Sequence, residues 1–435
     1  MINEKLNKGI YTGFWFLDGN EEKKVSGTLT FRNDGRIIFK TLENLIQEKS
    51  IQYYNNQINH HLVYGLAVDD IDKNHVIYLY NLAQIRNTVT SNRIDVVTYD
   101  VPIALIGKPI KHELQDSFNT LFLSSDSWQK FIKTTGFEKT EYGEEEFSST
   151  HSYTQPNTIN LHEDNDIKVE IYFRATSQHK RNELTIIERP FLNIEFKNEK
   201  TLREIFEVRI FFERLLMIFF GRTHTFSTTQ VRTGENTDLH VYENRRIFDR
   251  SLGAKFKDED LFETFSSLFL KWKEVEERFS MSIKAFFFAL TDFKMDVNSQ
   301  FLNYVFALEQ FHKKLFGEQK EPMAEKNKPM YEKAVQELES EDVKKWLEQT
   351  FSKKKNVSFK NRLNALINEV DFGLISKNNI ERIESTRHYL VHLDEQHKSL
   401  ALTGEEVYKI NEKLVSFIFK LLKKELEVAT VKQLK

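Results

Sequence analysis

One short segment of the chain contains residue types that can act on a phosphodiester. It runs Glu384-Ser-Thr-Arg387-His388-Tyr-Leu-Val-His392-Leu-Asp394, with four residues between Arg387 and His392. A histidine titrates near neutral pH, so it can take the proton of an RNA 2′-hydroxyl or give one to the leaving 5′-oxygen. An arginine guanidinium is a permanent and bidentate counter-charge for a phosphorane. These residue types therefore fit metal-independent cleavage of RNA.

The spacing by itself is a weak signal, because two other pairs in the chain have comparable spacings: Arg174 with His179, and Arg382 with His388. Short motifs of this kind often match by chance. Arg387 differs from the other two arginines because a polar residue follows it and because it lies late in a helical region. From the residues alone, the simpler interpretation is structural: an Arg–Glu surface pair and a partly buried histidine on a helix.

The same segment has features of a metal site. His388 and His392 are four residues apart, and Glu384 extends the same helix face. Helical histidine pairs at this spacing can bind zinc. The His-Glu-x-x-His signature is absent, since Tyr389 follows His388, and a third ligand would have to be Glu384 or His397. We therefore expect no metal ion and no other cofactor, and metal-dependent hydrolysis is the less favoured alternative.

Two regions of different periodicity are expected to position this segment. Up to about residue 200, short alternating strands are separated by turn signals such as Asn33-Asp34-Gly35. This pattern predicts an antiparallel sandwich or barrel-like domain. Apolar spacing then predicts a helix over 202–219, extended chain over 223–241, and helices from about residue 258 nearly to the end.

The expected fold class is therefore α+β and multidomain. We expect a β-rich N-terminal domain over residues 1–255, with one helix near 201–221, followed by a helical connector over 256–298. An all-helical domain is expected over 299–435. Its predicted helices cover 301–315, 330–338, 343–351, 359–370, 378–393 and 405–427.

The composition excludes several classes of protein. The chain has 435 residues and a net charge of −3. It has no cysteine, which excludes disulfides, a thiolate nucleophile and Cys-ligated metal clusters. Walker A, dinucleotide-binding glycine and Gly-x-Ser-x-Gly motifs are absent, which argues against NTPases, dehydrogenases and esterases. The first residues lack the apolar run of a signal peptide, and the stretch 211–220 is far shorter than the ~20 apolar residues of a membrane span. We therefore expect a cytoplasmic protein with no membrane partner.

The densest basic run is Lys353-Lys354-Lys355, with Lys360 and Arg362 close behind. Lysine and arginine supply contacts to the phosphate backbone of nucleic acids. From position 299 onward the chain also contains more Lys and Arg than Asp and Glu, whereas the preceding part contains fewer. We therefore assign RNA binding to these five residues, with a solvated loop between helices as an alternative of equal weight.

One resemblance covers most of the chain. A helical C-terminal region with a late Arg-(Asn/His/Asp)-x3-His motif resembles the HEPN ribonuclease domains of prokaryotic defence and toxin systems. More specifically, Gly13-Phe-Trp15, Gly27-Thr-Leu-Thr-Phe31 and Gly35 resemble the opening strands and turn of the β-rich N-terminal domain of Apea-like HEPN proteins. Ala307-Leu308-Glu309 resembles an early HEPN helix, and His388 stands where the family more often has Asn.

This resemblance implies a C-terminal HEPN helical bundle that is a metal-independent endoribonuclease, with Arg387 and His392 catalytic and His388 supporting them. HEPN domains usually form homodimers in which both motifs face one cleft, so two copies would supply two Arg and two His. The resemblance also implies RNA as substrate, with transfer RNA as a candidate, and a role in antiphage abortive infection. The N-terminal domain would sense a phage-derived trigger, hold the ribonuclease inactive or position the RNA. The alternative is a non-catalytic HEPN-like module for dimerisation or for binding a phage component or nucleic acid.

Overall fold

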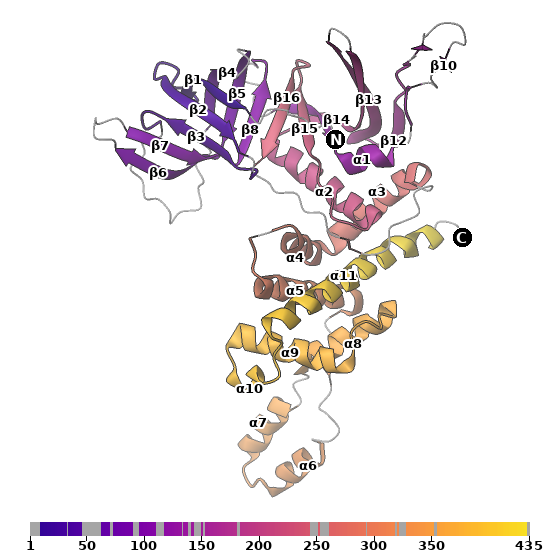
Figure 1. Ribbon diagram of the computed structural model, residues 1–435. Helices are drawn as coiled ribbons and strands as arrows, with labels where there is room; N and C mark the ends of the chain where they lie inside the picture. The colour runs from indigo at the N-terminus through magenta and orange to yellow at the C-terminus, as the bar shows by residue number, and fades with distance from the viewer. Residues whose placement is uncertain are drawn as a thin grey trace. The chain divides into compact units, whose positions relative to one another are not determined.

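The computed structural model describes residues 9–432, apart from positions 33, 46–61, 70–72, 90–94, 110–116, 133, 138–140, 143–148, 151–152, 181–182, 244–250, 253–260, 293, 318–319, 322–327 and 352–354. Strands dominate the N-terminal half of the chain and helices the C-terminal half (Figure 1). The chain divides into two compact units. The β unit comprises Met1–Glu213, His224–Phe248 and Asp258–Phe265, and the helical unit comprises Arg214–Thr223, Asp249–Lys257 and Ser266–Lys435.

The β unit is built on one 14-stranded sheet, in the order β12-β13-β14-β9-β15-β16-β8-β5-β4-β1-β2-β3-β7-β6. Each of its described strand pairs is antiparallel, which confirms the expected β-rich antiparallel N-terminal region. The strands are β1 Ile10–Leu17, β2 Val25–Phe31, β3 Ile37–Thr41, β4 Leu62–Val68, β5 Asn74–Tyr80, β6 Ala83–Val89, β7 Asp95–Asp100, β8 Ile103–Gly107, β9 Phe118–Ser124, β12 Ile159–Glu163, β13 Ile167–Lys180, β14 Glu183–Lys200, β15 Thr228–Thr233 and β16 Asp238–Glu243. The short helix α1 Asp126–Phe131 contacts β14, and β10 Glu141–Tyr142 pairs with β11 Ser149–Thr150.

Trp15 explains the spacing of glycines at the start of the chain. Its ring is fully buried, and its Nε1 donates to the carbonyl oxygen of Gly27 at 3.0 Å. A Cβ on Gly65 of the neighbouring strand β4 would lie 2.2 Å from this ring. A Cβ on Gly13 would lie 2.1 Å from the carbonyl oxygen of Leu66. The aromatic and glycine pattern of the first strands is therefore a packing pattern of the sheet core.

Helices make up most of the helical unit, as expected for the C-terminal part of the chain. They are α4 Ser280–Thr291, α5 Val297–Phe316, α6 Lys328–Glu337, α7 Glu341–Phe351, α8 Phe359–Val370, α9 Lys377–His392, α10 Glu395–Lys398 and α11 Gly404–Lys432. Two further helices, α2 Leu202–Phe220 and α3 Leu261–Arg278, begin in the β unit and end in the helical unit. The strands β17 Lys320–Glu321 and β18 Lys355–Asn356 form a two-stranded antiparallel ladder at the two ends of the segment that contains α6 and α7.

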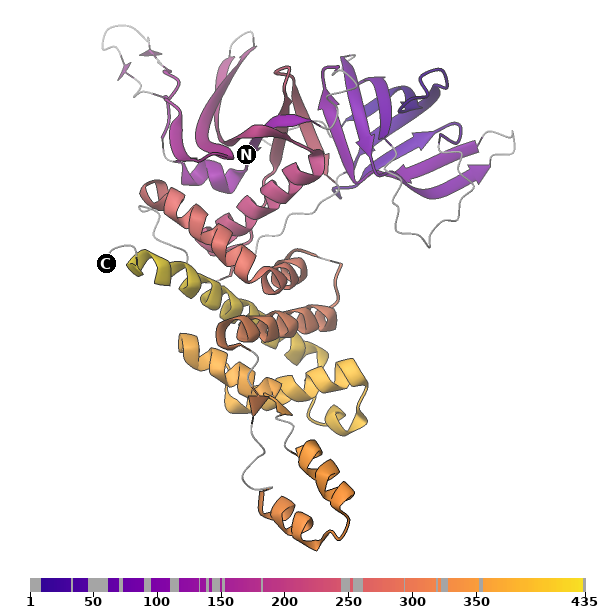
Figure 2. The same cartoon turned by 180° about the vertical axis from the view of Figure 1, so that it is seen from behind.

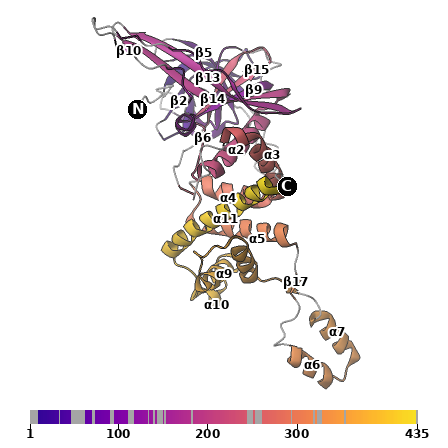
Figure 3. The ribbon, with the colours of Figure 1, turned by 90° about the vertical axis from the view of Figure 1, so that its right-hand side faces the viewer.

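The helix α5 is the centre of this unit. It contacts α4, α8, α9 and α11, and the view from behind shows it between α4 and the pair α8 and α9 (Figure 2). The side view shows the same order (Figure 3). The apolar face of α5, which includes Phe301, Tyr304, Leu308 and Phe311, is fully buried. Side chains of α5 can therefore reach α8 and α9 on one side of the bundle.

Candidate active site

The helix α9 carries the predicted motif. The side chain of Ser376 caps its N-terminus, and Ile380 and Ile383 bury one of its faces. The helix ends at His392 because the next residue, Leu393, adopts the left-handed conformation with a φ of 52°. The motif therefore occupies the last turns of a helix that is anchored by its first half.

Arg387 is held by side chains from two other helices. Its Nη2 lies 3.0 Å from Oε1 of Glu309 on α5, and its guanidinium carbon lies 5.7 Å from the centre of the Phe359 ring on α8. The side chains of Arg387 and Glu309 are only 25% and 16% exposed. Such a pair fixes the direction of the guanidinium, which has five N–H donors and can still bind a second anion. An ion pair of this kind also agrees with the structural interpretation of the motif.

Three histidine rings lie together around the end of α9. The ring centre of His388 is 5.8 Å from that of His392 and 4.9 Å from that of His397, and the His388 and His397 planes are stacked at 19°. Burial lowers the pKa of His388, and the charges of Arg387 and of the two other histidines lower it further, while Glu384 opposes them. His388 is therefore the neutral imidazole at pH 7, whereas His392 is exposed to solvent.

His397 reaches this cluster through the chain reversal that follows α9. The side chain of Asp394 accepts a hydrogen bond from the backbone of Gln396 at 3.0 Å and so begins the short helix α10. The segment after α10 is bonded back to α9, since the backbone N–H of Leu402 donates to Thr386 Oγ1 at 2.8 Å. These local bonds hold His397 against His388.

The two competing arginines of the sequence have other roles. Arg382 donates to both carboxylate oxygens of Glu406 at 2.6 Å each, so it links α9 to the first turn of α11. Arg174 lies on β13 in the β unit, where it donates to Gln230 at 2.8 Å and to Asp238 at 3.4 Å. Of the three arginines, Arg387 is the one beside the histidine cluster.

Comparison with known families covers both parts of the chain. The family model described as ApeA N-terminal domain 1 matches residues 10–286, which is more than half of the chain. A second model, described as Apea-like HEPN, matches residues 302–431. The chain belongs to the Apea-like HEPN family. No curated protein and no solved structure matches it.

The residues of the candidate site all lie in the part that matches Apea-like HEPN. This part includes Glu309 on α5, Phe359 on α8, the motif on α9 and His397 on α10. An ApeA N-terminal domain joined to an Apea-like HEPN domain is the architecture of a HEPN-type defence module. HEPN domains are typically ribonucleases and often form dimers, so the membership supports a nucleic-acid function for this end of the chain.

Glu309 is a site residue that the sequence did not assign. It appeared there only within Ala307-Leu308-Glu309, as part of a helix signature. The available signal was a carboxylate directly after Leu308, at the edge of a buried helix face, where a charged group needs a partner. Nothing local identifies Arg387 as that partner, because the two residues are far apart in the sequence.

Part of the predicted RNA-binding set cannot be placed in the structure. Lys353 and Lys354 lie outside the described residues. Lys355 is the first residue of β18, and only its backbone is described.

The other two members of the set lie on α8 beside α9. Lys360 Nζ donates to Glu381 of α9 at 2.6 Å, and its backbone N–H donates to Glu384 at 3.3 Å. The carboxylate of Glu381 raises the pKa of Lys360, which therefore stays charged at neutral pH. Arg362 donates from Nε to the carbonyl oxygen of Val357 at 3.0 Å. Lys360 therefore lies beside Glu384, three residues before Arg387 on α9.

The described part of the chain shows no cluster of three or more His, Asp or Glu side chains arranged to hold a metal ion. The stacking of His388 and His397 gives one reason. A metal ion bound by an imidazole nitrogen lies in the plane of the ring, and two stacked rings do not direct their nitrogens to a common point. In the same part of the chain, no helix is long and apolar enough to cross a membrane.

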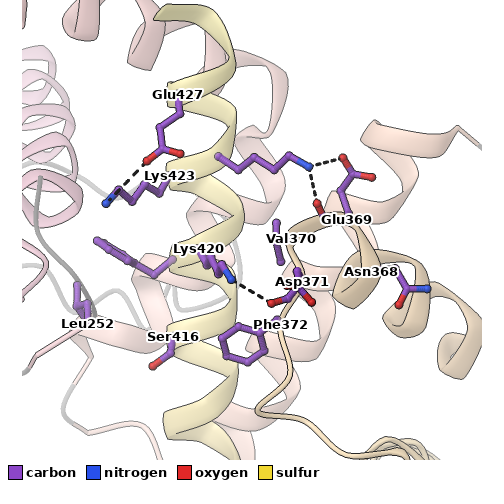
Figure 4. Close-up of a pocket in the computed structure, with 12 residues that line it drawn as sticks. Leu252, Asn368, Glu369, Val370, Asp371, Phe372, Ser416, Lys420, Lys423 and Glu427 are labelled. Carbon is purple, nitrogen blue, oxygen red and sulfur yellow. Dashed lines mark hydrogen bonds and ion pairs between the residues drawn. The ribbon is translucent and has the colours of Figure 1, made fainter. Parts of the chain in front are cut away.

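A cavity of about 640 Å³ in the helical unit is separate from the motif (Figure 4). It is lined by the end of α8, the turn that follows and one face of α11. Lys420 donates to the carbonyl oxygen of Asp371 at 3.1 Å, and Lys424 donates to that of Glu369. Both lysines therefore cap the C-terminal end of α8, a structural role that accounts for their position.

Proposed function

We propose that this protein is a metal-independent endoribonuclease and that its active site is built around Arg387 and His392. The observation that carries the proposal is the placement of Arg387. Its Nη2 lies 3.0 Å from Oε1 of Glu309, and it stands at the same end of α9 as the exposed His392. A fixed cation beside an accessible imidazole is the set that RNA transesterification requires. Membership of the Apea-like HEPN family supports the same chemistry.

The reaction uses the RNA's own 2′-hydroxyl as nucleophile. His392 takes the proton from this hydroxyl while the 2′-oxygen forms a bond to phosphorus. Arg387 binds the non-bridging oxygens, on which negative charge increases in the phosphorane. The bond from phosphorus to the 5′-oxygen then breaks, and the leaving oxygen receives a proton. The products carry a 2′,3′-cyclic phosphate and a 5′-hydroxyl.

His388 has a supporting role in this scheme. Its pKa is lowered, first by burial and then by Arg387, so it remains neutral beside the guanidinium and can stack without repelling the other rings. A homodimer through the helical domain would bring a second copy of Arg387 and His392 into the same cleft. We propose RNA, with transfer RNA as the first candidate, as the substrate, and antiphage abortive infection as the biological role.

In this proposal the N-terminal part of the chain regulates the ribonuclease. We place the regulatory or sensing domain in residues 1–255, a helical connector in 256–298 and the HEPN domain in 299–435. A phage-derived component is the trigger that fits this arrangement best. Lys353, Lys354, Lys355, Lys360 and Arg362 would hold the RNA backbone through phosphate contacts.

A second candidate function is a non-catalytic HEPN module for dimerisation or binding. The ion pair between Arg387 and Glu309 favours it, because a structural role alone would account for this arginine. In that case Arg387 stabilises the fold and His392 has no chemical task.

Two kinds of measurement separate these functions. Arg387→Gln and His392→Gln should each abolish RNA cleavage and growth arrest while the protein remains folded. End analysis should find cyclic phosphate and 5′-hydroxyl termini, unaffected by EDTA, and an RNA with a 2′-deoxy nucleotide at the cleavage site should stay intact. Growth arrest that persists in both variants would support the binding module. Products with 5′-phosphate ends that disappear with chelator would instead support a metallohydrolase.

A further inference from the structure

We propose that His397 is a second catalytic residue of this site, the acid that protonates the leaving 5′-oxygen while His392 takes the proton of the 2′-hydroxyl. The inference rests on the proposed ribonuclease function and adds a residue outside the Arg-x4-His motif. It assigns both proton transfers of the reaction to side chains of one chain. The step is balanced: one proton passes to His392 as the 2′-oxygen bonds to phosphorus, and one passes from His397 as the bond to the 5′-oxygen breaks.

The chain reversal after α9 places His397 in the site. Leu393 has a left-handed backbone with a φ of 52°, and Asp394 caps α10 directly after it. His397 then lies in the last turn of α10, with its ring stacked on that of His388 at 4.9 Å. The ring centre of His388 also lies 5.8 Å from that of His392. His388 therefore neighbours both His392 and His397, and the three rings form one cluster at the end of α9.

The charged groups beside the two stacked rings differ between His397 and His388. Nε2 of His397 lies 3.8 Å from Oδ2 of Asp394. Two stacked imidazoles do not readily carry a proton each, because the like charges would face one another. Burial lowers the pKa of His388, and the positive charge of Arg387 lowers it further. His397 is therefore the ring of the stacked pair that faces a carboxylate, and we assign the donor role to it.

The side chain of His397 is also accessible to a substrate. It is 36% exposed, and the side chain of its partner Asp394 is 40% exposed. The neighbouring Lys398 contacts Glu395 at 3.0 Å and lies 6.0 Å from the centre of the Tyr389 ring, so it has a separate set of contacts. Lys398 thus provides a matched control: it is adjacent in sequence and on the same short helix, but does not stack on His388.

The decisive experiment removes the need for an acid. A 5′-bridging phosphorothiolate replaces the leaving oxygen with sulfur, which departs without protonation. The full-length protein and its His397→Gln, His392→Gln and Lys398→Gln variants are compared on an oxygen substrate and on the matched sulfur substrate. General acid catalysis contributes about 10²- to 10⁴-fold, so His397→Gln should lose at least about 10²-fold on the oxygen substrate. Most of this loss should disappear on the sulfur substrate.

The controls distinguish the possible failures. His392→Gln should be inactive on both substrates, because loss of the base is not repaired by a better leaving group, and Lys398→Gln should match the wild type on both. A His397→Gln variant that cleaves the oxygen substrate normally, or whose loss sulfur does not relieve, overturns the inference and leaves the proposed function intact. A wild-type protein that cleaves neither substrate under conditions of growth arrest overturns both.

A second measurement does not depend on cleavage. The groups that face His388 are Glu384, Arg387 and His392 on α9 and His397 on α10. Replacing His397 by Gln removes one positive neighbour, so the NMR titration midpoint of His388 in ¹³C-histidine-labelled protein should move to higher pH. The same midpoint should be unchanged in Lys398→Gln. A His388 midpoint that does not respond to His397→Gln would contradict the coupling on which the acid role depends.

Discussion

Glu309 on α5 and Arg387 on α9 form an ion pair of 3.0 Å that joins the two helices carrying the most informative residues of the HEPN domain. Both side chains are partly buried. The ring of Phe359, on the third helix α8, lies 5.7 Å from the guanidinium carbon of Arg387 and restricts where this group can move. The pair therefore fixes where Arg387 can present its remaining N–H groups. Such fixed donors stabilise a transition state without the cost of ordering them during the reaction.

The first prediction concerns this pair. Glu309→Gln keeps the size of the side chain but removes the charge that orients Arg387, so cleavage should slow by about 10- to 100-fold while RNA affinity changes little. The free energy of unfolding should fall by about 1 kcal/mol, as expected for a single, partly exposed ion pair. Single-turnover kinetics and denaturant unfolding measure the two effects. Glu405→Gln, which breaks an exposed pair with Lys409 on α11, is the control and should alter neither quantity. An undiminished rate in Glu309→Gln would show that Arg387 needs no orientation by α5.

The second prediction concerns pH and His312 on α5. This side chain is 2% exposed, and its Nδ1 has no hydrogen-bond partner among the described residues. Burial, and then the charge of Arg362, lowers its pKa below 6.5. The unfolded chain therefore binds this proton at a higher pH than the folded chain does, and the free energy of unfolding decreases as pH falls below about 6.5. One residue contributes a slope of at most about 1.4 kcal/mol per pH unit.

Unfolding at pH 7.5 and at pH 5.5 provides the measurement. His312→Leu should lose less stability than the wild type between these two values, because no proton is taken up at this position on unfolding. Lys313→Gln, on the same helix but exposed, should retain the wild-type difference. Identical pH dependence in the wild type and in His312→Leu would mean that His312 is not held neutral in the fold.

Local patterns in the sequence predicted the helices well and the sheet only in part. The helix expected over 359–370 coincides with α8 Phe359–Val370, because the capping residue Ser358 and the apolar spacing are both local features. The strand β9 Phe118–Ser124 was not predicted, although it lies between β14 and β15 in the middle of the sheet. Its position depends on pairing with strands that are distant in the chain, which no local pattern specifies. The strands β13 and β14 also extend beyond their apolar residues, because their pairing continues through polar residues as far as Lys180 and Glu183.

The site divides in the same way. Arg387, His388 and His392 share one helix, so their spacing alone brought them together. Glu309 and Phe359 come from other helices, and their contacts with Arg387 exist only after the bundle is packed. His397 is near in sequence but depends on the left-handed turn at Leu393, a conformation that the residue type does not suggest. Residues on one element were therefore predictable, and those that depend on tertiary packing or an unusual backbone were not.

The third prediction tests the packing of the first strands. Gly65→Ala places a methyl group 2.2 Å from the fully buried Trp15 ring, so either the ring or β4 must move. Overpacking of this kind costs about 1–3 kcal/mol, and the β unit should unfold at a lower denaturant concentration. Gly373→Ala is a suitable control, because a Cβ there meets nothing within 4 Å. Equal unfolding midpoints in both variants would indicate that Trp15 is free to shift.

The last prediction tests the assignment of Lys360 to RNA binding. This lysine is 41% exposed and lies on α8 next to the motif helix, where Glu381 raises its pKa and keeps it charged. If it contacts a phosphate, Lys360→Gln should weaken RNA binding to a similar extent for all sequences, and the slope of log affinity against log salt should decrease by about 1. Fluorescence anisotropy with a cleavage-resistant 2′-deoxy oligonucleotide between about 50 and 200 mM salt measures both quantities. Lys409→Gln, an exposed and ion-paired lysine on α11, controls for the change in net charge. Equal slopes in the two variants would mean that Lys360 serves only its ion pair with Glu381, and that the RNA backbone is held by other residues.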